Sequence, residues 1–261
     1  MSENTFISTQ SIQTVGNAVD QFKLISLEEM DNVTLMDRMD MKFILPFPVL
    51  EPVLADMKPE YRVLTLCNRK VFGYRTDYYD TPEWVMFFDH HNGKLNRFKI
   101  RYREYLDSQL RFLEVKFRSN KGRIIKQRIE DCAADRQLFN DFIAKHTPYN
   151  PQSLNCTVTS YFNRCTFVND QMGERVTADF NLVFSDSVRN ISLNRLAIIE
   201  IKQDHADTTS KIYQALKRYS IRPATLSKYC IGLSLLKQPL KMNNFKPIIM
   251  NIKKLSHVEF S

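Results

Sequence analysis

Charged and apolar residues alternate along several short segments of this chain, and the alternation limits what the chain can fold into. In residues 198–202 (IIEIK), Ile199 and Ile201 fall on one side of a strand and Glu200 and Lys202 on the other, because strand side chains alternate with a period of two. The same alternation recurs at residues 97–103, 114–118, 126–130 and 175–179. Strands with one apolar and one polar face predict an antiparallel sheet.

The charges on these strands differ from those of an ordinary solvated face. Such a face mixes Lys, Glu, Thr, Ser and Gln, whereas these faces are rich in Arg and Lys, and residues 98–105 (FKIRYREY) place Lys99, Arg101 and Arg103 on one side. Like charges that face each other across a sheet are destabilising, so we expect the fold to bind an anion there. For any one strand taken alone, simple exposure to water remains the alternative.

Closure of the sheet accounts for both faces. Amphipathic helices can cover the apolar side, and closure removes the sheet edges and turns the polar side into the lining of a channel. The sequence therefore predicts an α+β protein with a polar-lined barrel and helices packed outside. A basic channel with a few acids suits a polyphosphate chain held through Mg²⁺ or Mn²⁺, since carboxylates bind hard cations and Arg and Lys bind phosphate oxygens.

Composition narrows the possible functions. The chain has 261 residues with a formal net charge of +8, which favours an anionic partner without identifying it. Five cysteines, with no CxxC pair, indicate reduced thiols rather than a disulfide scaffold or a zinc site. Neither GxxxxGK[ST] nor GxGxxG occurs, so phosphates would be bound by side chains and not by a glycine-rich loop.

We divide the chain into three parts. Residues 1–22 are polar, lack the apolar core of a signal peptide and are predicted to be flexible. Residues 23–240 form the predicted tunnel domain, and residues 241–261 a basic tail. No apolar run approaches the length of about 18 residues that a membrane-spanning helix needs. We therefore expect a cytoplasmic protein, and association with a membrane through a partner protein stays open.

Amphipathic segments between the strands predict the covering helices. They occur at residues 46–58, 131–145, 209–219 and 227–237, with a shorter segment at 22–30. In the second of these, Asp131 is the predicted N-cap. Its predicted buried stripe consists of Leu138, Phe139, Phe142 and Ile143.

Eight segments, taken in order, resemble the VTC domain (vacuolar transporter chaperone), a branch of the triphosphate tunnel metalloenzymes. They are DRMDMKF (37–43), YRTDYYDTPEW (74–84), FKIRYREY (98–105), LEVKFRSNKGRIIKQR (113–128), YFNR (161–164), ERVTADF (174–180), IIEIK (198–202) and LSKYC (226–230). Each motif alone is weak, but the ordered set is specific. The resemblance implies a closed eight-stranded antiparallel barrel that forms a tunnel. It also implies synthesis of polyphosphate from ATP, by transfer of the γ-phosphoryl group to a growing chain.

The resemblance also implies roles for individual residues. Arg38 and Lys42 lie on the first tunnel strand and Lys228 reaches in from the helical segment, and we assign these three a catalytic role. Glu200 is expected to hold the metal, Mn²⁺ or Mg²⁺, with Glu114 as a second acid. The expected phosphate-binding residues are Arg101, Arg103, Lys116, Lys126, Arg128, Arg164, Arg175 and Lys202. For Asp179 two roles stay open, metal binding and an ion pair with an arginine.

The chain departs from hydrolytic members of this superfamily on the first strand. Those members begin with an ExExK motif, whereas this strand reads Arg38-x-Asp40-x-Lys42. The missing carboxylate favours transfer to a chain over hydrolysis. Two alternatives remain, a metal-dependent tripolyphosphatase or nucleoside triphosphatase, and a non-catalytic module that binds polyphosphate or inositol phosphate. Direct nucleic-acid binding is not expected, because the aromatic residues that single strands need for stacking alternate away from the basic face.

Overall fold

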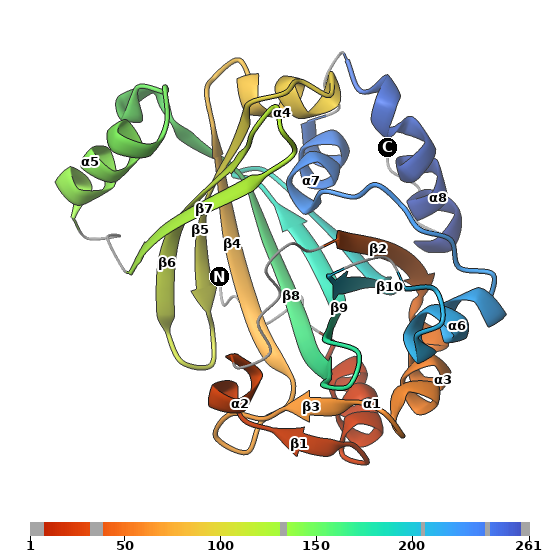
Figure 1. The fold of residues 1–261 in the computed structure, drawn as a ribbon. Coiled ribbons are helices and arrows are strands. Elements are labelled where there is room, and N and C mark those ends of the chain that lie inside the picture. The colour runs from red at the N-terminus through yellow and green to blue at the C-terminus, as the bar shows by residue number, and fades with distance from the viewer. Residues whose placement is uncertain (1–7, 32–38, 131–134, 205–206, 238–240, 257–261) are drawn as a thin grey trace.

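The computed structural model describes residues 8–31, 39–130, 135–204, 207–237 and 241–256 (Figure 1). Its centre is a sheet in which eight strands follow one hydrogen-bonded order, β2-β10-β9-β8-β4-β5-β6-β7. Every pairing along this path is antiparallel. The strands are β2 (Met39–Pro46), β4 (Phe72–Asp80), β5 (Arg97–Tyr105), β6 (Leu110–Arg118), β7 (Ile124–Glu130), β8 (Asn155–Asn169), β9 (Glu174–Ser185) and β10 (Asn190–Gln203).

The sheet curls until strands that are far apart in its order face each other. Lys99 of β5 lies close enough to Lys42 of β2 for their charges to interact, and Lys116 of β6 is equally within reach of Asp40 of β2. The predicted eight-stranded antiparallel barrel is thus confirmed. Between the described residues of β7 and β2 there is no backbone pairing, so hydrogen bonds do not join the two end strands.

Three helices cover the outer, apolar face of the sheet, as the alternation predicts. They are α1 (Thr9–Val19), α3 (Phe47–Met57) and α6 (Lys211–Arg218). Phe43 of β2 and Ile199 of β10 are buried in this layer together with Leu50 of α3 and Ile212 of α6. The apolar side of the IIEIK strand therefore forms part of the main outer core.

A second apolar layer lies on the inner side of the sheet, beside the charges. Ile44 on β2 and Ile198 on β10 are each two residues from a charged inner residue, Lys42 and Glu200. Both isoleucines pack with α7 (Lys228–Lys237) instead of facing the charged part of the sheet. We call the charged part of the inner side, which carries Lys42 and Glu200, the channel face, and the part under α7 the apolar floor.

Two local features make the apolar floor possible. On β9, Phe180 packs in the outer layer whereas Phe184 packs under α7, although both are even-numbered. Asn181 between them has φ +52°, in the left-handed region, and this breaks the alternation. On α7, a Cβ at Gly232 would lie 2.7 Å from Cδ1 of Phe184, so only glycine lets the helix approach this closely.

The remaining elements surround the barrel. α4 (Val85–His91), α7 and α8 (Lys246–Ser256) lie together at the top of Figure 1, and α5 (Arg136–His146) projects to one side. Short 3₁₀ turns occur at Pro151–Ser153 and Asn243–Phe245. No helix within the described ranges is long and apolar enough to cross a membrane.

Both ends of the chain contain helices where the sequence predicts a flexible segment and a tail. Residues 9–19 form α1, whose Val15 and Val19 are buried in the outer layer. Residues 246–256 form α8, with Ile249 and Ile252 buried against the barrel. A few apolar residues at helical spacing suffice to dock a mostly polar helix on an existing core. The division of the chain at residues 22 and 240 stays a prediction.

The helix predicted at residues 131–145 begins later. Asp135, not Asp131, is its N-cap, and its side chain accepts a hydrogen bond from the Leu138 backbone N–H at 2.9 Å. Asp131 lies outside the described residues. Leu138 is 42% exposed, so the buried stripe is narrower than predicted. Its buried members are Phe139, Phe142 and Ile143.

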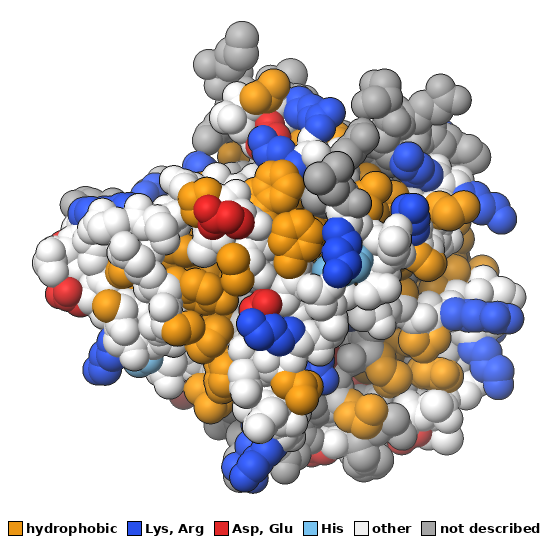
Figure 2. Space-filling model, turned by 90° about the horizontal axis from the view of Figure 1, so that it is seen from above, with side chains coloured by type: hydrophobic (Ala, Val, Ile, Leu, Met, Phe, Trp, Pro, Cys, Tyr) orange, Lys and Arg blue, Asp and Glu red, His pale blue; other side chains and the backbone are white. Residues whose placement is uncertain are grey.

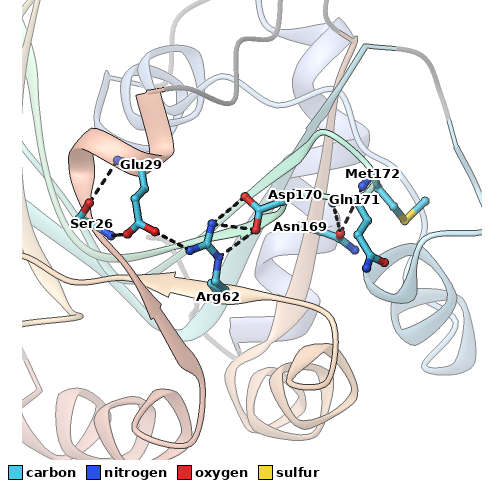
Figure 3. A network of polar contacts seen from close by, with 7 residues as sticks. All are labelled: Ser26, Glu29, Arg62, Asn169, Asp170, Gln171 and Met172. Atoms are coloured by element: carbon cyan, nitrogen blue, oxygen red, sulfur yellow. Dashed lines mark hydrogen bonds and ion pairs between the residues drawn. The ribbon is translucent and has the colours of Figure 1, made fainter.

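Residues 22–30, predicted as one short helix, instead form β1 (Lys23–Ile25) and α2 (Leu27–Asp31), and β1 pairs with β3 (Arg62–Leu64). The Ser26 N–H donates to Oε2 of Glu29 at 2.9 Å and the Glu29 N–H donates to Oγ of Ser26 at 3.1 Å, a capping box that fixes where α2 begins. Arg62 then joins Glu29 to Asp170 beyond β8, with N–O distances of 2.9 Å to each (Figure 3).

Candidate functional site

The basic residues of β5 and β6 meet on the channel face through the register of the sheet. Lys99 lies opposite Lys116, and Arg101 lies opposite Glu114. On the other side of β5, Arg103 pairs with Thr76 of β4. The predicted sharing of one face by alternate residues of these strands is therefore what the backbone pairing produces.

Glu114 is enclosed by cations. Its side chain is 2% exposed, and it accepts hydrogen bonds from Nε of Arg101 and from Nζ of Lys126 on β7. Burial raises the pKa of this carboxyl, but the neighbouring arginines and lysine outweigh burial and hold that pKa at about 2. Glu114 therefore stays ionised as the counter-ion of two cations.

Asp179 of β9 has a similar environment. Arg164 of β8 donates to both its oxygens, from Nε at 2.5 Å and from Nη2 at 2.8 Å, and Lys228 at the start of α7 donates to Oδ2. Burial raises the pKa of Asp179, yet Arg164 and Lys228 together lower it to about 2. Of the two roles left open for Asp179, the structure shows the ion pair with an arginine.

Glu200 of β10 is the most open of these carboxylates. Lys42 lies 2.8 Å from one of its oxygens and Lys202 lies 2.9 Å from the other. Its side chain is 16% exposed, compared with 2% for Glu114 and 1% for Asp179. Burial opposes ionisation, but Lys202 and Lys42 hold the pKa of Glu200 well below its usual range.

These carboxylates fit a divalent cation only in a limited way. Within the described ranges, no three His, Cys, Asp or Glu side chains are grouped closely enough to hold a metal ion. Mg²⁺ commonly uses only one or two carboxylates and takes its other ligands from water and substrate phosphates. Glu200 fits that pattern better than Glu114 and Asp179, because its side chain is 16% exposed and theirs are 2% and 1% exposed, although lysines contact both of its oxygens as well.

Several cations on the channel face have no hydrogen bond to a carboxylate among the residues that the structure describes. Nε of Arg103 is buried and has no hydrogen-bond partner among the described residues. Lys99 donates to the neutral Oγ of Ser227 at 2.9 Å. Burial and nearby cations lower the pKa of Lys99 to about 8. Burial and the charge of Lys99 likewise lower the pKa of Lys116 to about 8. Positive charge is therefore concentrated here beyond what the carboxylates neutralise.

Aromatic rings line the channel face, contrary to the expectation that they alternate away from it. Tyr74 of β4 and Phe162 of β8 stack with their centroids 5.1 Å apart and an interplanar angle of 6°. The Arg164 guanidinium lies over both rings, 5.2 Å and 5.3 Å from their centroids, and Lys228 lies 4.5 Å above Phe162. The register that pairs Thr76 with Arg103 cannot be derived from β4 alone, so the general expectation is wrong for these two rings.

The other predicted residues lie at the margins. Nη2 of Arg175 on β9 donates to the Met30 carbonyl of α2 at 3.0 Å. Arg128 on β7 is exposed and its guanidinium lies 4.9 Å from the Phe112 ring. Arg38 lies outside the described residues. The predicted residues that lie within the described ranges are thus all on or beside the channel face. Their roles stay predictions.

The charge of the channel face is not repeated on the outer surface seen from above. There, lysines and arginines are scattered among hydrophobic and neutral side chains, with small groups at the edges of the view (Figure 2). A continuous basic field of the kind that attracts a nucleic-acid backbone is absent from the described residues of this view.

Comparison with known proteins supplies a family. The family model for the VTC domain matches residues 37–237. Solved structures with a similar fold include a protein from Hippeastrum, proposed to be an adenylyl cyclase, that has a dominant triphosphatase activity (13% identity, 80% of this chain and 99% of that chain, TM-score 0.48). Another, proposed to be an adenylate cyclase, comes from Bacillus halodurans (13% identity, 74% and 96% coverage, TM-score 0.45). No curated protein sequence gives a significant match.

Proposed function

Because the chain belongs to the VTC domain family, we propose that it is a metal-dependent polyphosphate polymerase. It would transfer the γ-phosphoryl group of ATP to the end of a growing polyphosphate chain bound on the channel face. One observation carries this proposal, the buried guanidinium of Arg103, whose Nε has no hydrogen-bond partner within the described part of the chain. Glu114 offsets part of this positive charge but is shared with Arg101 and Lys126, so an anionic ligand would offset the remaining cost of burial.

The arrangement suits phosphoryl transfer, in which neutralisation and alignment of charge do most of the work. Arg101 and Arg164 are held in place by Glu114 and Asp179 and so keep fixed directions for their remaining N–H groups. Lys42 would bind phosphate oxygens from the opposite wall. A divalent cation, held by Glu200 and substrate oxygens, would neutralise charge that develops on the phosphates.

Transfer to a chain is favoured over hydrolysis by the state of the carboxylates. A hydrolase needs a base to activate water, and a useful base has a pKa near the working pH. The pKa values of Glu114 and Asp179 are about 2, and that of Glu200 is well below its usual range because of its lysines. A terminal phosphate oxygen is already anionic and needs no base. The acceptor therefore fits this site better than water does.

The deciding experiment is incubation of the purified protein with ATP and Mn²⁺, with polyphosphate and orthophosphate measured in one reaction. We expect chain growth in the wild type, and in Arg38→Glu a larger share of ATP lost as orthophosphate. Orthophosphate as the only product at every metal and acceptor concentration would establish the triphosphatase alternative. Binding of polyphosphate without turnover would establish the non-catalytic one.

A polyphosphate polymerase has defined ligands and an expected location. ATP and inorganic polyphosphate would be the ligands, and nucleic acid would not bind directly. A cytoplasmic location, with a membrane-protein partner that receives the product, is the corresponding expectation. Copurification of a tagged chain with the membrane fraction, before and after extraction of peripheral proteins, tests it.

A further inference from the structure

One row across three neighbouring strands carries polar atoms that nothing in the described structure satisfies. Arg103 on β5 lies opposite Thr76 on β4, and Thr76 lies opposite Ser160 on β8. The exposed fractions of Thr76 and Ser160 are 0% and 1%. Oγ1 of Thr76, Oγ of Ser160 and Nε of Arg103 are all buried without a hydrogen-bond partner in the described ranges. Buried hydroxyls normally find a partner, so three such atoms in one row need an explanation.

The row has a defined place in the fold. Directly opposed residues of an antiparallel pair have Cβ atoms about 4.5–5.5 Å apart, so the three side chains are neighbours. Along the strands, the stacked Tyr74 and Phe162 lie on one side of the row. Tyr78, which stacks on Tyr229 of α7, lies on the other side. The row therefore marks the boundary where the channel face meets α7.

Charge decides what fits the row. Water could satisfy the two hydroxyls, but it would add no negative charge beside the buried guanidinium of Arg103, which shares the carboxylate of Glu114 with Arg101 and Lys126. An oxyanion satisfies all three, because each hydroxyl can turn to donate and Nε of Arg103 donates as well. The two hydroxyls add donors without adding positive charge, so they recognise the number of oxygens rather than the total charge of the ligand.

We propose that Thr76, Ser160 and Arg103 form the seat for the terminal phosphoryl group of a bound polyphosphate chain. The proposal rests on the proposed function, since it assumes an anionic phosphate ligand on the channel face. A terminal phosphoryl group has three non-bridging oxygens and an internal one has two, and the row offers donors from three adjacent strands. The seat would thus distinguish the end of a chain from its interior.

The test compares the binding of linear tripolyphosphate with that of cyclic trimetaphosphate, which has no terminal group, by calorimetry on the whole chain. The variants are Thr76→Val and Ser160→Ala, which remove one hydroxyl each. Ser234→Ala is the matched control, because Oγ of Ser234 on α7 is also buried without a partner in the described part of the chain. Each seat variant should bind the linear ligand about 3- to 10-fold more weakly, the effect of one lost hydrogen bond.

The two seat variants should bind the cyclic ligand as the wild type does, and Ser234→Ala should bind both ligands normally. All three should melt no lower than the wild type without ligand, since each only removes an unsatisfied group. Equal weakening towards both ligands would overturn the assignment to the chain end. If Thr76→Val and Ser160→Ala bind the linear ligand as tightly as the wild type while Arg103→Lys binds it more weakly, the seat is overturned and the proposed function stands. Unchanged binding in Arg103→Lys as well would remove the basis of both.

Discussion

The inner side of the sheet has two halves that the same strands build in opposite ways. β2 contributes Lys42 to the channel face and Ile44 to the apolar floor, and β10 contributes Glu200 and Ile198 in the same manner. One pleat thus separates a partly buried ion pair from a dry contact with α7. The strands alone do not decide the character of this side, because the residues change from charged to apolar where the helix begins.

The difference indicates which half stabilises the fold. The apolar floor gains from burial and close packing, whereas the channel face gathers like charges that repel one another and are partly desolvated. Residues that break the usual rules of folding in this way are expected at functional sites. Changes in the channel face should therefore affect ligands more than stability, and changes in the floor should affect stability first.

The largest effect should follow loss of the open carboxylate. Glu200→Gln keeps the size of the side chain but removes the charge between Lys42 and Lys202. We expect turnover at limiting Mn²⁺ to fall by about 100-fold or more, with the fold retained. The measurement is the initial rate of polyphosphate formation together with a thermal melt. Glu60→Gln, which alters an exposed ion pair with Lys211, is the control. Turnover at the wild-type rate in Glu200→Gln would show that Glu200 does not hold the metal.

Replacement of a channel arginine by lysine should come next. Lysine keeps the charge of Arg103 but cannot reproduce the planar fork that binds two phosphate oxygens at once. We expect Arg103→Lys to weaken tripolyphosphate binding by about 1–3 kcal/mol, measured by calorimetry. Arg218→Lys, which changes an exposed pair with Asp56, should bind normally. Equal affinities for these two variants would contradict a direct contact.

The apolar floor should respond in the opposite way. Gly232→Ala places a Cβ 2.7 Å from the Phe184 ring, and overpacking of this kind costs about 1–3 kcal/mol of unfolding free energy. Gly16→Ala in α1 meets no atom within 4 Å and should instead stabilise the protein by about 0.5–1 kcal/mol. Denaturant unfolding of both variants measures the contrast. A gain in stability from Gly232→Ala would mean that α7 is not seated as described.

How much of this could be read from the sequence differs between the two halves. Alternation within β5, β6 and β10 is local, so it correctly places Arg101, Glu114 and Glu200 on one side of their strands. Their partners across the sheet depend on register, but the polar–apolar pattern already restricts register to steps of two. Most of the channel face therefore follows from short segments.

The apolar floor could not be predicted in the same way. The left-handed Asn181 reverses the alternation of β9, and no residue pattern around it indicates this. Gly232 is meaningful only once α7 and Phe184 are known to meet. The position of Tyr74 beside the channel face could likewise not be predicted, because a strand that is polar and aromatic on both faces does not show which face points inward. These features depend on contacts between segments that are distant in the chain.

A smaller, pH-dependent effect separates ligand binding from stability. Burial lowers the pKa of Lys99 to about 8, below the value of about 10.4 for an unperturbed lysine. Between these pH values the unfolded chain binds a proton that the folded chain does not, so this residue makes the free protein more stable as pH rises. Phosphate binding needs the charged form and should weaken as pH rises through about 8. Lys99→Met should reduce both trends and leave the part that Lys116 contributes, since the pKa of Lys116 is also lowered to about 8. Calorimetry and denaturant unfolding at pH 7 and pH 9.5 measure both trends.

The smallest effect should come from a similar ion pair placed in water. Arg62 bonds to both oxygens of Asp170 and to Glu29, which is the same chemistry as Arg164 with Asp179 (Figure 3). Its partners are 44% and 54% exposed, however, and exposed ion pairs contribute only about 0–1 kcal/mol each. Arg62→Met should therefore lower the unfolding free energy by about 1 kcal/mol, and the loss should shrink in 1 M salt because water and ions screen the pairs. Tripolyphosphate binding should stay within about twofold of wild type, since Arg62 lies outside the channel face. A loss of unfolding free energy above about 3 kcal/mol that salt does not reduce would show that water is excluded from this network as it is from the channel face. Exposure to water would then not distinguish the two regions.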